Sequence, residues 1–441
     1  MTSSPRATRR VVVTGLGVIT PLGNTIESYW DALSSGRSGV TQLDIVPNEF
    51  MPTAAAAQIR DFTGAVEDFG ALEGERKKAI RKGIKLMCRE CQMGVAAAQR
   101  ALDQSGLVGG NFDPERAGIV YGSDYMLSDP LEFNSGMQAC SDEDRQFIFD
   151  RWGEIGMQQM SPLWLLKYLP NMPACHIAIY NDLRGPNNSL TQREASANLA
   201  IGEAFRTITR GSADLMIAGA TGTRLHLMKT LHVSQQEELA PHGRPPAEAS
   251  RPFDRDRAGM VLGEGSAALV LEELGHAEAR GAKIYAEVVG IGSSFVADRK
   301  SVARRGKALG NVARMALKEA GISPASLGHI HAHGLSTRSC DTEEAAAITQ
   351  VLDGATAEVP IVAAKSHFGN LGAGSGAAEL VASILALEAG HLFPVLNFEH
   401  PDPENRLAVS TSSQVGAGQS ALNLNVTPQG QASAVVVSRL G

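Results

Sequence analysis

Short apolar runs suited to buried strands alternate with amphipathic helical segments along almost the whole chain. Strands are predicted at residues 9–23, 117–124, 187–192, 213–221, 265–274, 283–295, 329–334, 361–369 and 433–440. Helices are predicted at residues 28–35, 81–105, 195–210, 306–320 and 377–389, several of them ended by glycine. Such alternation is typical of sheets buried under helices, so it predicts a mixed α/β fold.

The second half of the chain repeats the rhythm of the first. Each half places a helix after a short polar turn, which suggests an internal duplication meeting near residue 260. We therefore expect an N-terminal half, 1–260, and a C-terminal half, 261–441. Residues 125–175 are irregular, and they are expected to form an insertion in the first half that covers one end of the fold.

Composition narrows the class of function. The chain has 441 residues with 47 acidic and 40 basic side chains, a formal net charge of −7, which does not suit a nucleic-acid binder. No apolar run reaches the length of a membrane span, and the opening residues lack the pattern of a secretory signal. Five cysteines are too few and too scattered for a disulfide scaffold, so a cytoplasmic location is expected.

Two local patterns resemble metal or redox sites. Cys88 and Cys91 form a C-x-x-C, but the predicted helix 81–105 places them in its middle, which favours two ordinary helix residues. His329, His331 and His333 alternate along one predicted strand without a supporting carboxylate or thiolate motif. We expect no metal site and a single functional histidine at the end of that strand.

Five segments in order resemble the β-ketoacyl-acyl-carrier-protein synthases of the thiolase superfamily. They are VVVTGLGVITPLGN, RGPNNSLTQREASANLAIGEAFRTITRGSADLMIAGAT, RPFDRDRAGMVLGEGSAALVLEEL, HAHGLSTRSCDTEEAAAI and AAKSHFGNLGAGSGAAELVASILAL. The resemblance covers nearly the whole chain. It implies a thiolase-like, pseudo-duplicated five-layer α-β-α-β-α sandwich and no cofactor.

The first departure from the family lies at the nucleophile. Condensing members place a cysteine at the start of a helix, where the helix dipole and backbone N–H groups activate the thiol. Glu194 stands at the matching position here. A carboxylate is a much weaker nucleophile, so normal Claisen condensation is not expected. Burial and a substrate carboxylate nearby are expected to raise the pKa of Glu194. The alternative is a vestigial Glu194 that only caps its own helix.

The second departure lies in the histidine motifs. His333 matches the first family histidine, whereas Asn370 replaces the second. The resemblance implies that Lys365 orients the site through a salt bridge or water network in which Glu344 is the acidic partner. The alternative for Glu344 is an ordinary acid on a helix surface. Supporting roles are implied for Thr337, Asp341 and Gly369, which lie in the same motifs.

The third departure is the gate. Thr427, Pro428 and Gln429 stand where the family has a glycine-rich loop with a gating phenylalanine. Proline stiffens a loop, so a swinging gate is not expected. We also expect Glu194, His333 and Asn370 to converge on one buried pocket, with Glu194 close to a positively charged His333.

Three functions follow from these departures. The first is a partner subunit resembling a chain-length factor in fatty-acid or polyketide synthesis, with malonyl decarboxylation retained as an option. The second is a malonyl-carrier-protein decarboxylase or chain initiator. The third is an enzyme in which Glu194 acts as general base on a thioester or β-keto substrate. The resemblance implies acyl carrier protein as a partner and a homodimer, or a heterodimer with an active ketosynthase.

Overall fold

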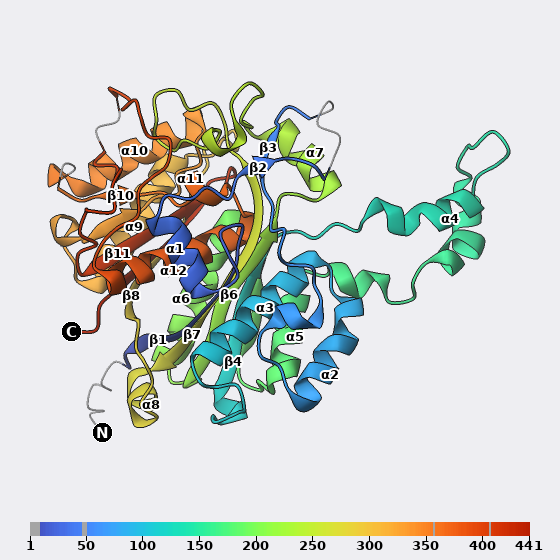
Figure 1. The fold of residues 1–441 in the computed structure, drawn as a ribbon, viewed down its shortest axis with the longest axis horizontal. Helices are drawn as coiled ribbons and strands as arrows, with labels where there is room; N and C mark the ends of the chain where they lie inside the picture. The colour runs from blue at the N-terminus through green and yellow to red at the C-terminus, as the bar shows by residue number, and fades with distance from the viewer. Residues whose placement is uncertain (1–8, 46–50, 356–357, 405–406) are drawn as a thin grey trace.

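Two sets of five strands share one order and one pattern of directions. The structure is a computed structural model that describes residues 9–45, 51–355, 358–404 and 407–441 (Figure 1). In the first set the order is β1, β7, β6, β4, β5, and in the second it is β8, β12, β11, β9, β10. In each set the first two pairings are antiparallel and the last two are parallel. This match confirms the predicted duplication of topology.

The strand bounds show where the two sets begin and end. The first set comprises β1 (Val11–Ile19), β4 (Ala117–Ser123), β5 (Asn187–Leu190), β6 (Leu215–Thr223) and β7 (Leu262–Glu273). The second comprises β8 (Ala286–Phe295), β9 (His329–His331), β10 (Ile361–Val362), β11 (Ser420–Val426) and β12 (Gln431–Ser438). By its pairing with β1 and β6, β7 groups with the first set, although the expected division at residues 260 and 261 assigned it to the second.

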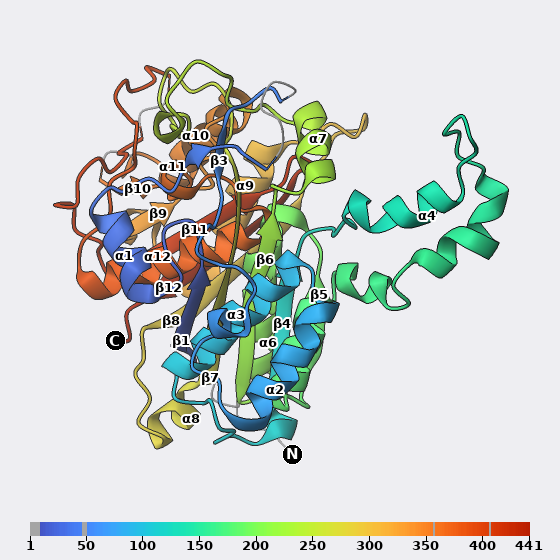
Figure 2. The same cartoon turned by 45° about the vertical axis from the view of Figure 1, so that its right-hand side comes forward.

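Helices form three layers around these sheets, which confirms the α-β-α-β-α sandwich. The middle layer contacts strands of both sets and consists of α6 (Ser196–Thr209) and α12 (Ser375–Ala389). One outer layer, α3 (Arg89–Gln104) and α5 (Met172–Asn181), covers the first set. The other, α9 (Arg305–Ala320) with α10 (Arg338–Leu352), covers the second. Figure 2 shows α3 in front of the strands of the first set.

Close packing explains two glycines of the first strand. A Cβ atom on Gly15 would lie 2.3 Å from the carbonyl oxygen of Ala101, and one on Gly17 would lie 2.0 Å from that of Ala97. Both oxygens belong to α3, so only glycine allows this helix to lie directly on β1.

The predicted helix 81–105 is interrupted, which corrects the placement of the two cysteines. The chain forms α2 (Gly74–Gly83), a 3₁₀ turn at Ile84–Leu86, and then α3. Met87 has an extended backbone and Cys88 is the N-cap of α3. Gly83 at the end of α2 is a poor helix former, which favours the break. The C-x-x-C therefore lies at a helix N-terminus and not in the middle of a helix.

Most of residues 125–175 form an arm that stands away from the body of the molecule, whereas the last of them, from Met172 on, begin α5 in the outer layer (Figure 1 and Figure 2). The arm contains α4 (Asn134–Ala139) and a series of single turns at Pro130–Phe133, Phe149–Arg151, Trp152–Gly156, Met157–Gln159 and Trp164–Tyr168. The insertion was predicted to cover one end of the fold, but it projects from the end of β4 instead. The arm packs on itself through ring contacts of Phe133 with Trp152 and Trp164.

The remaining elements are short and connect the main layers. They are α1 (Ile26–Ser34), β2 (Thr41–Gln42), β3 (Ala55–Ala57), α7 (Leu227–Gln236), α8 (Leu274–Ala279) and α11 (Lys365–Phe368), with single turns at Val66–Phe69, Pro114–Arg116, Arg193–Ala195, Pro246–Glu248, Pro324–Ser326 and Gly372–Gly374. No described helix is long and apolar enough to span a bilayer.

Candidate active site

Glu194 lies in the turn between β5 and α6. The turn Arg193–Ala195 precedes α6, and the backbone N–H of Gln192 donates to the Ser196 hydroxyl over 2.8 Å. Arg193 has a φ of +49°, which is uncommon for a residue with a side chain and is found at strained functional turns. The sharp turn places the Glu194 side chain at the N-terminal end of α6, where it is 1% exposed.

Two arginines hold the Glu194 carboxylate. Arg224 forms an ion pair with one carboxylate oxygen, and Arg193 Nε lies 3.5 Å from the other. Arg224 also lies 3.0 Å from the carboxylate of Asp124, and the Arg224 and Asp124 side chains have no exposed surface. Asp124 directly follows β4 and Arg224 directly follows β6. The site is therefore built where three parallel strands end, which is the usual place for functional groups in α/β folds.

This ion pairing corrects the expected charge state of Glu194. Burial acts to raise the pKa of the carboxyl, but the guanidinium groups of Arg224 and Arg193 outweigh it and hold the pKa well below its ordinary value. The prediction of a raised pKa was wrong because it left out Arg193, which adjoins Glu194, and Arg224, which lies outside the quoted motifs. Glu194 is thus ionised at physiological pH.

Asn370 comes from the second half and contacts Glu194 directly. Its side-chain Nδ2 donates to the carboxylate over 3.1 Å, while its Oδ1 accepts from the N–H of Gly372 and the hydroxyl of Ser375. Its backbone is fixed as well, because the Asn370 N–H donates to Val261. The side-chain Nδ2, the side-chain Oδ1 and the backbone N–H of Asn370 thus all make hydrogen bonds within the protein.

Gly369 makes this placement possible. Its φ is +65°, and a Cβ atom would lie 2.7 Å from the carbonyl oxygen of Val261. A side chain at this position would force the backbone away from Val261, and Asn370 would move with it.

His333 lies beyond β9 at the same buried centre. Lys365 Nζ donates to the His333 carbonyl over 2.7 Å and lies 3.3 Å from its Nδ1. Burial, followed by the nearby Lys365 ammonium, holds the pKa of His333 well below its ordinary value. The imidazole is therefore neutral, and the expected pair of Glu194 with a charged His333 is wrong: Arg224 and Arg193 supply the positive charge.

The acidic partner of Lys365 is Glu379, not Glu344. Lys365 Nζ forms a buried ion pair with Glu379, and Asn425 Nδ2 donates to the same carboxylate over 2.7 Å. Glu344 instead accepts from the backbone N–H groups of His333 and Gly334 over 2.6 and 2.8 Å. It is fully buried on α10, so the alternative of a helix-surface acid is also wrong.

The supporting residues fix the backbone around His333. Asp341 accepts from the N–H groups of Leu335 and Phe253, each over 2.9 Å. Thr337 is the N-cap of α10 and its side chain accepts from the N–H of Cys340. These contacts hold the segment that follows β9 against the segment that precedes β7.

The residues at the gate position form a tight hairpin turn. The backbone N–H of Thr427 donates to the carbonyl oxygen of Gln431 over 2.8 Å. The backbone N–H of Gly430 donates to the carbonyl oxygen of Thr427 over 3.0 Å. Pro428 and Gln429 form the tip between β11 and β12. Gly430 has a φ of +94°, which suits glycine at the end of such a turn.

The other two strand histidines have separate structural partners. His329 Nδ1 lies 2.9 Å from the Ala417 carbonyl oxygen and His331 Nδ1 lies 3.0 Å from the Ser383 hydroxyl. His331 Nε2 also accepts from the backbone N–H of Ala364, so both of its ring nitrogens are used within the core.

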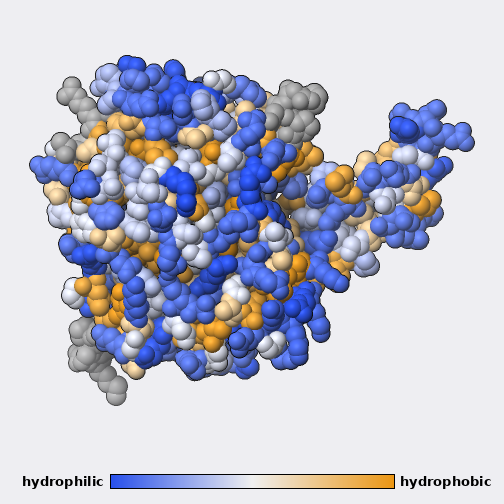
Figure 3. Space-filling model, viewed as in Figure 1, coloured by the Kyte–Doolittle hydropathy of each residue, from blue (hydrophilic) through white to orange (hydrophobic). Residues whose placement is uncertain are grey.

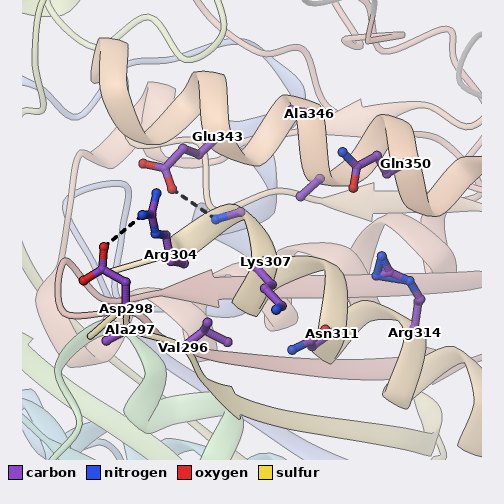
Figure 4. A pocket seen from close by; sticks show the side chains of 12 residues that line it. Val296, Ala297, Asp298, Arg304, Lys307, Asn311, Arg314, Glu343, Ala346 and Gln350 are labelled. Carbon is purple, nitrogen blue, oxygen red and sulfur yellow. Dashed lines mark hydrogen bonds and ion pairs between the residues drawn. The ribbon is translucent and has the colours of Figure 1, made fainter. Parts of the chain in front are cut away.

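The predicted cluster is closed from solvent, and a cavity lies elsewhere. Glu194, His333 and Asn370 are each 1% exposed. A cavity of 790 Å³ lies between α9, α10 and the end of β8, and Figure 4 shows its lining. Two contacts shape it, an ion pair between Arg304 and Asp298 and a hydrogen bond from the Gly306 N–H to Glu343. None of its lining residues is among the predicted site residues.

Sequence reasoning missed the residues that surround Glu194 and Lys365. These are Asp124, Arg193, Arg224, Glu379 and Asn425. Arg193 adjoins Glu194 and Glu379 lies within a motif, so both were visible. Asp124 and Arg224 carried one signal, which is that Asp124 ends a predicted buried strand and Arg224 lies three residues beyond another.

Comparison with known proteins places this geometry in a family. The sequence profile of the beta-ketoacyl synthase N-terminal domain matches residues 8–277, and that of the beta-ketoacyl synthase C-terminal domain matches residues 285–399. The chain belongs to the beta-ketoacyl synthase family. A 3-oxoacyl-[acyl-carrier-protein] synthase 2 of Synechocystis sp. is 35% identical over 400 residues, covering 90% of this chain and 89% of that relative.

Solved ketosynthases have the same fold. A type II polyketide synthase ketosynthase structure, determined with its acyl-carrier protein, superposes with a TM-score of 0.83 at 27% identity, covering 98% of this chain and 100% of the other. The ishigamide ketosynthase/chain length factor superposes with a TM-score of 0.82 at 27% identity, covering 99% and 100%. These beta-ketoacyl synthase relatives support a role in fatty-acid or polyketide synthesis.

Proposed function

We propose that this chain is a non-acylating member of the beta-ketoacyl synthase family, a partner subunit that resembles a chain-length factor. The observation that carries the proposal is the buried ion pair of Glu194 with Arg224, supplemented by the hydrogen bond from Asn370. The pair fills the position where a condensing enzyme requires a thiol.

A nucleophilic role does not suit this arrangement. The carboxylate is ionised, and one of its oxygens is bound by Arg224 and accepts from Asn370, while Arg193 Nε lies 3.5 Å from the other. An acyl anhydride at Glu194 would also be short-lived in water. Attack on a thioester would require breaking a buried ion pair, which costs about 3–5 kcal/mol.

The decarboxylase alternative is less well supported. A neutral Glu194 would imitate the amide of an acylated site, but the arginines keep it charged. The charge would repel a malonyl carboxylate. The Asn370 amide N–H₂ that would stabilise a developing enolate already donates to Glu194.

The general-base alternative meets the same obstacle. A base works best when its pKa lies near the operating pH. The two guanidinium groups lower the pKa of Glu194 far below that range, so its affinity for a proton is weak.

The outer edge of the first sheet fits a partner subunit. β5 is the terminal strand of its set, and Asn187 and Asn188 are exposed. The adjoining arm carries apolar side chains in the open, including Leu131 at 77%, Phe149 at 75% and Met157 at 58% exposure. Figure 3 shows these apolar patches along the arm. An exposed strand edge and large exposed apolar side chains both mark association surfaces.

The carrier-protein partner fits a basic surface on α2. Its exposed side chains include Lys78, Arg81 and Lys82. Such a face attracts acidic proteins and the phosphate of a phosphopantetheine arm. Binding to a carrier protein is compatible with a subunit that performs no acyl transfer.

The test is to offer the chain its expected substrates alone and with a condensing partner. The purified protein is incubated with acyl- and malonyl-loaded carrier protein, followed by intact-mass analysis and measurement of carbon dioxide release. We expect no acyl adduct and no release above background. Co-expression with a cysteine-containing ketosynthase of the same host should give a complex whose product length changes when the chain is omitted. An acyl adduct on Glu194, or rapid decarboxylation by the chain alone, would overturn the proposal.

A further inference from the structure

Three sulfur atoms from two segments meet at the N-terminus of α3. Cys88 Sγ lies 3.7 Å from Cys91 Sγ, Cys88 Sγ lies 3.7 Å from Met126 Sδ, and Cys91 Sγ lies 3.9 Å from Met126 Sδ. The three atoms form a nearly equilateral triangle. All five cysteines of the chain are free, so no disulfide competes for these sulfurs.

The triangle has the size of a metal site. A point equidistant from the three sulfurs lies about 2.2 Å from each, close to the ~2.3 Å of a metal–thiolate bond. Filling the centre therefore requires little movement of the ligands. Three sulfurs in contact also arise from ordinary core packing, and the experiment below separates the two interpretations.

The donor set selects the ion. Two thiolates and one thioether are soft ligands, which favour monovalent copper over the oxygen-seeking cations. Zinc is held by four ligands drawn from cysteine, histidine and carboxylates, and a methionine sulfur is not among them. We propose that Cys88, Cys91 and Met126 form a three-coordinate site for Cu(I).

The surroundings suit this ion in two ways. Binding replaces the protons of two thiols, which leave to solvent, so the complex of Cu⁺ with two thiolates carries one negative charge. That charge would lie at the N-terminal end of the 16-residue helix α3, where the helix dipole stabilises anions. Cys91 is fully buried and Met126 is 8% exposed, whereas Cys88 is half-buried and gives the ion a path of entry.

The site would also join the arm to the body. Met126 lies at the beginning of the arm, and the carbonyl oxygen of Lys167, near its end, accepts from the Cys88 N–H and from the Cys91 thiol. A bound ion would therefore link α3 to the first segment of the arm, close to Lys167, where the chain comes back from the arm to the body. Limited proteolysis of the arm should slow when Cu(I) is bound.

The experiment is an anaerobic competition for Cu(I) between the full chain and a chromophoric chelator. We expect one Cu(I) per chain and sulfur-only coordination by X-ray absorption. Cys88→Ser should lose binding at least ~10-fold while folding normally, because serine is a good N-cap. Met126→Leu keeps an apolar side chain of similar volume and should weaken binding ~10-fold or more. Cys175→Ser, which removes a thiol outside the cluster, should bind as the wild type does.

Each contrary result has a defined meaning. Absence of stoichiometric Cu(I) binding by the wild type would overturn the proposal and leave core packing as the explanation. Wild-type affinity in Cys88→Ser would place the ion elsewhere. Wild-type affinity in Met126→Leu would reduce the site to a simple dithiol and overturn the three-sulfur assignment.

Discussion

The carboxylate of Glu194 and the side-chain amide of Asn370 form a hydrogen bond of 3.1 Å between the two halves of the fold. The two residues follow corresponding strands, β5 and β10, and precede corresponding helices, α6 and α12. The two residues that the sequence resemblance marks as departures from the family's pattern are therefore in direct contact, and each satisfies a polar group of the other.

Replacing Glu194 by glutamine should lower stability at neutral pH by about 3 kcal/mol, because Arg224 loses a buried partner. The pKa of Glu194 is depressed in the folded state. Its contribution to the free energy of unfolding is therefore fully present above the unfolded-state pKa of about 4.3 and is lost as pH falls below that value. Glu194→Gln should therefore show a shallower loss of stability between pH 5 and pH 3. Urea unfolding measures both effects. The exposed acid variant Glu143→Gln is the control, and equal acid slopes for Glu194→Gln and wild type would contradict the ion pair.

Replacing Arg224 by glutamine should destabilise the protein more than Glu194→Gln does. Arg224 has two buried acidic partners, Asp124 and Glu194, and its loss leaves both uncompensated. A loss of at least about 3–5 kcal/mol is expected. Arg224→Lys keeps the charge but cannot span both acidic partners as well. Its loss of stability should therefore lie between those of Glu194→Gln and Arg224→Gln. Chemical unfolding ranks the three variants, and a milder effect of Arg224→Gln than of Glu194→Gln would contradict this geometry.

Replacing Glu194 by cysteine should give a folded protein with little condensing activity. The turn before α6 and its hydrogen bond from Gln192 to Ser196 do not depend on the side chain of Glu194. The new thiol would lie beside Arg224, which favours the thiolate and should lower the pKa of the thiol. Product analysis should still show condensation at least ~100-fold below that of a cysteine-containing relative, because Asn370 replaces the second histidine. The double variant with Asn370→His should raise the rate. Full activity of the single variant would show that Asn370 does not limit the reaction.

Replacing Leu131 and Phe149 together by serine should weaken subunit association. Both side chains are exposed on the arm, and burying them would contribute about 1.5–3 kcal/mol each. Sedimentation of the wild type and the variant over a range of concentrations gives the dissociation constants, and an increase of at least ~10-fold is expected. Exchange of the exposed Glu143 for glutamine provides a matched surface control. An unchanged constant would place the interface away from these two side chains.

The fold could be predicted because its signals are local. Apolar runs such as Val11–Ile19 and Leu215–Thr223 are wholly buried strands, and the helices after them have clear apolar periodicity. The break before α3 was missed because residues 81–105 keep a helical pattern across it. The insertion at residues 125–175 was expected to cover one end of the fold because its sequence is irregular, whereas Phe133, Trp152 and Trp164 pack within the arm.

The site was predicted in part for a similar reason. Glu194, His333, Lys365 and Asn370 lie in contiguous motifs, and in the buried interior Glu194 contacts Asn370 and His333 contacts Lys365. The charge balance was not predictable, since Arg224 lies 30 positions beyond Glu194 and meets it only through the pairing of parallel strands. The partner of Lys365 was misassigned because two neighbouring motifs each contain a buried acid, Glu344 on α10 and Glu379 on α12, and their distances to the ammonium group depend on the packing of these helices.

The repeated topology leads two helices to begin at the same point. The N-terminal ends of α6 and α12 approach each other, and the partial positive charges of both act on the space between them. Such a space is a receptor for an anion, and in this protein the anion is part of the chain. A tethered ligand has a high effective concentration and never diffuses away. Any free carboxylate or oxyanion must therefore compete with the Glu194 carboxylate for this space, so the chain itself blocks its own anion site.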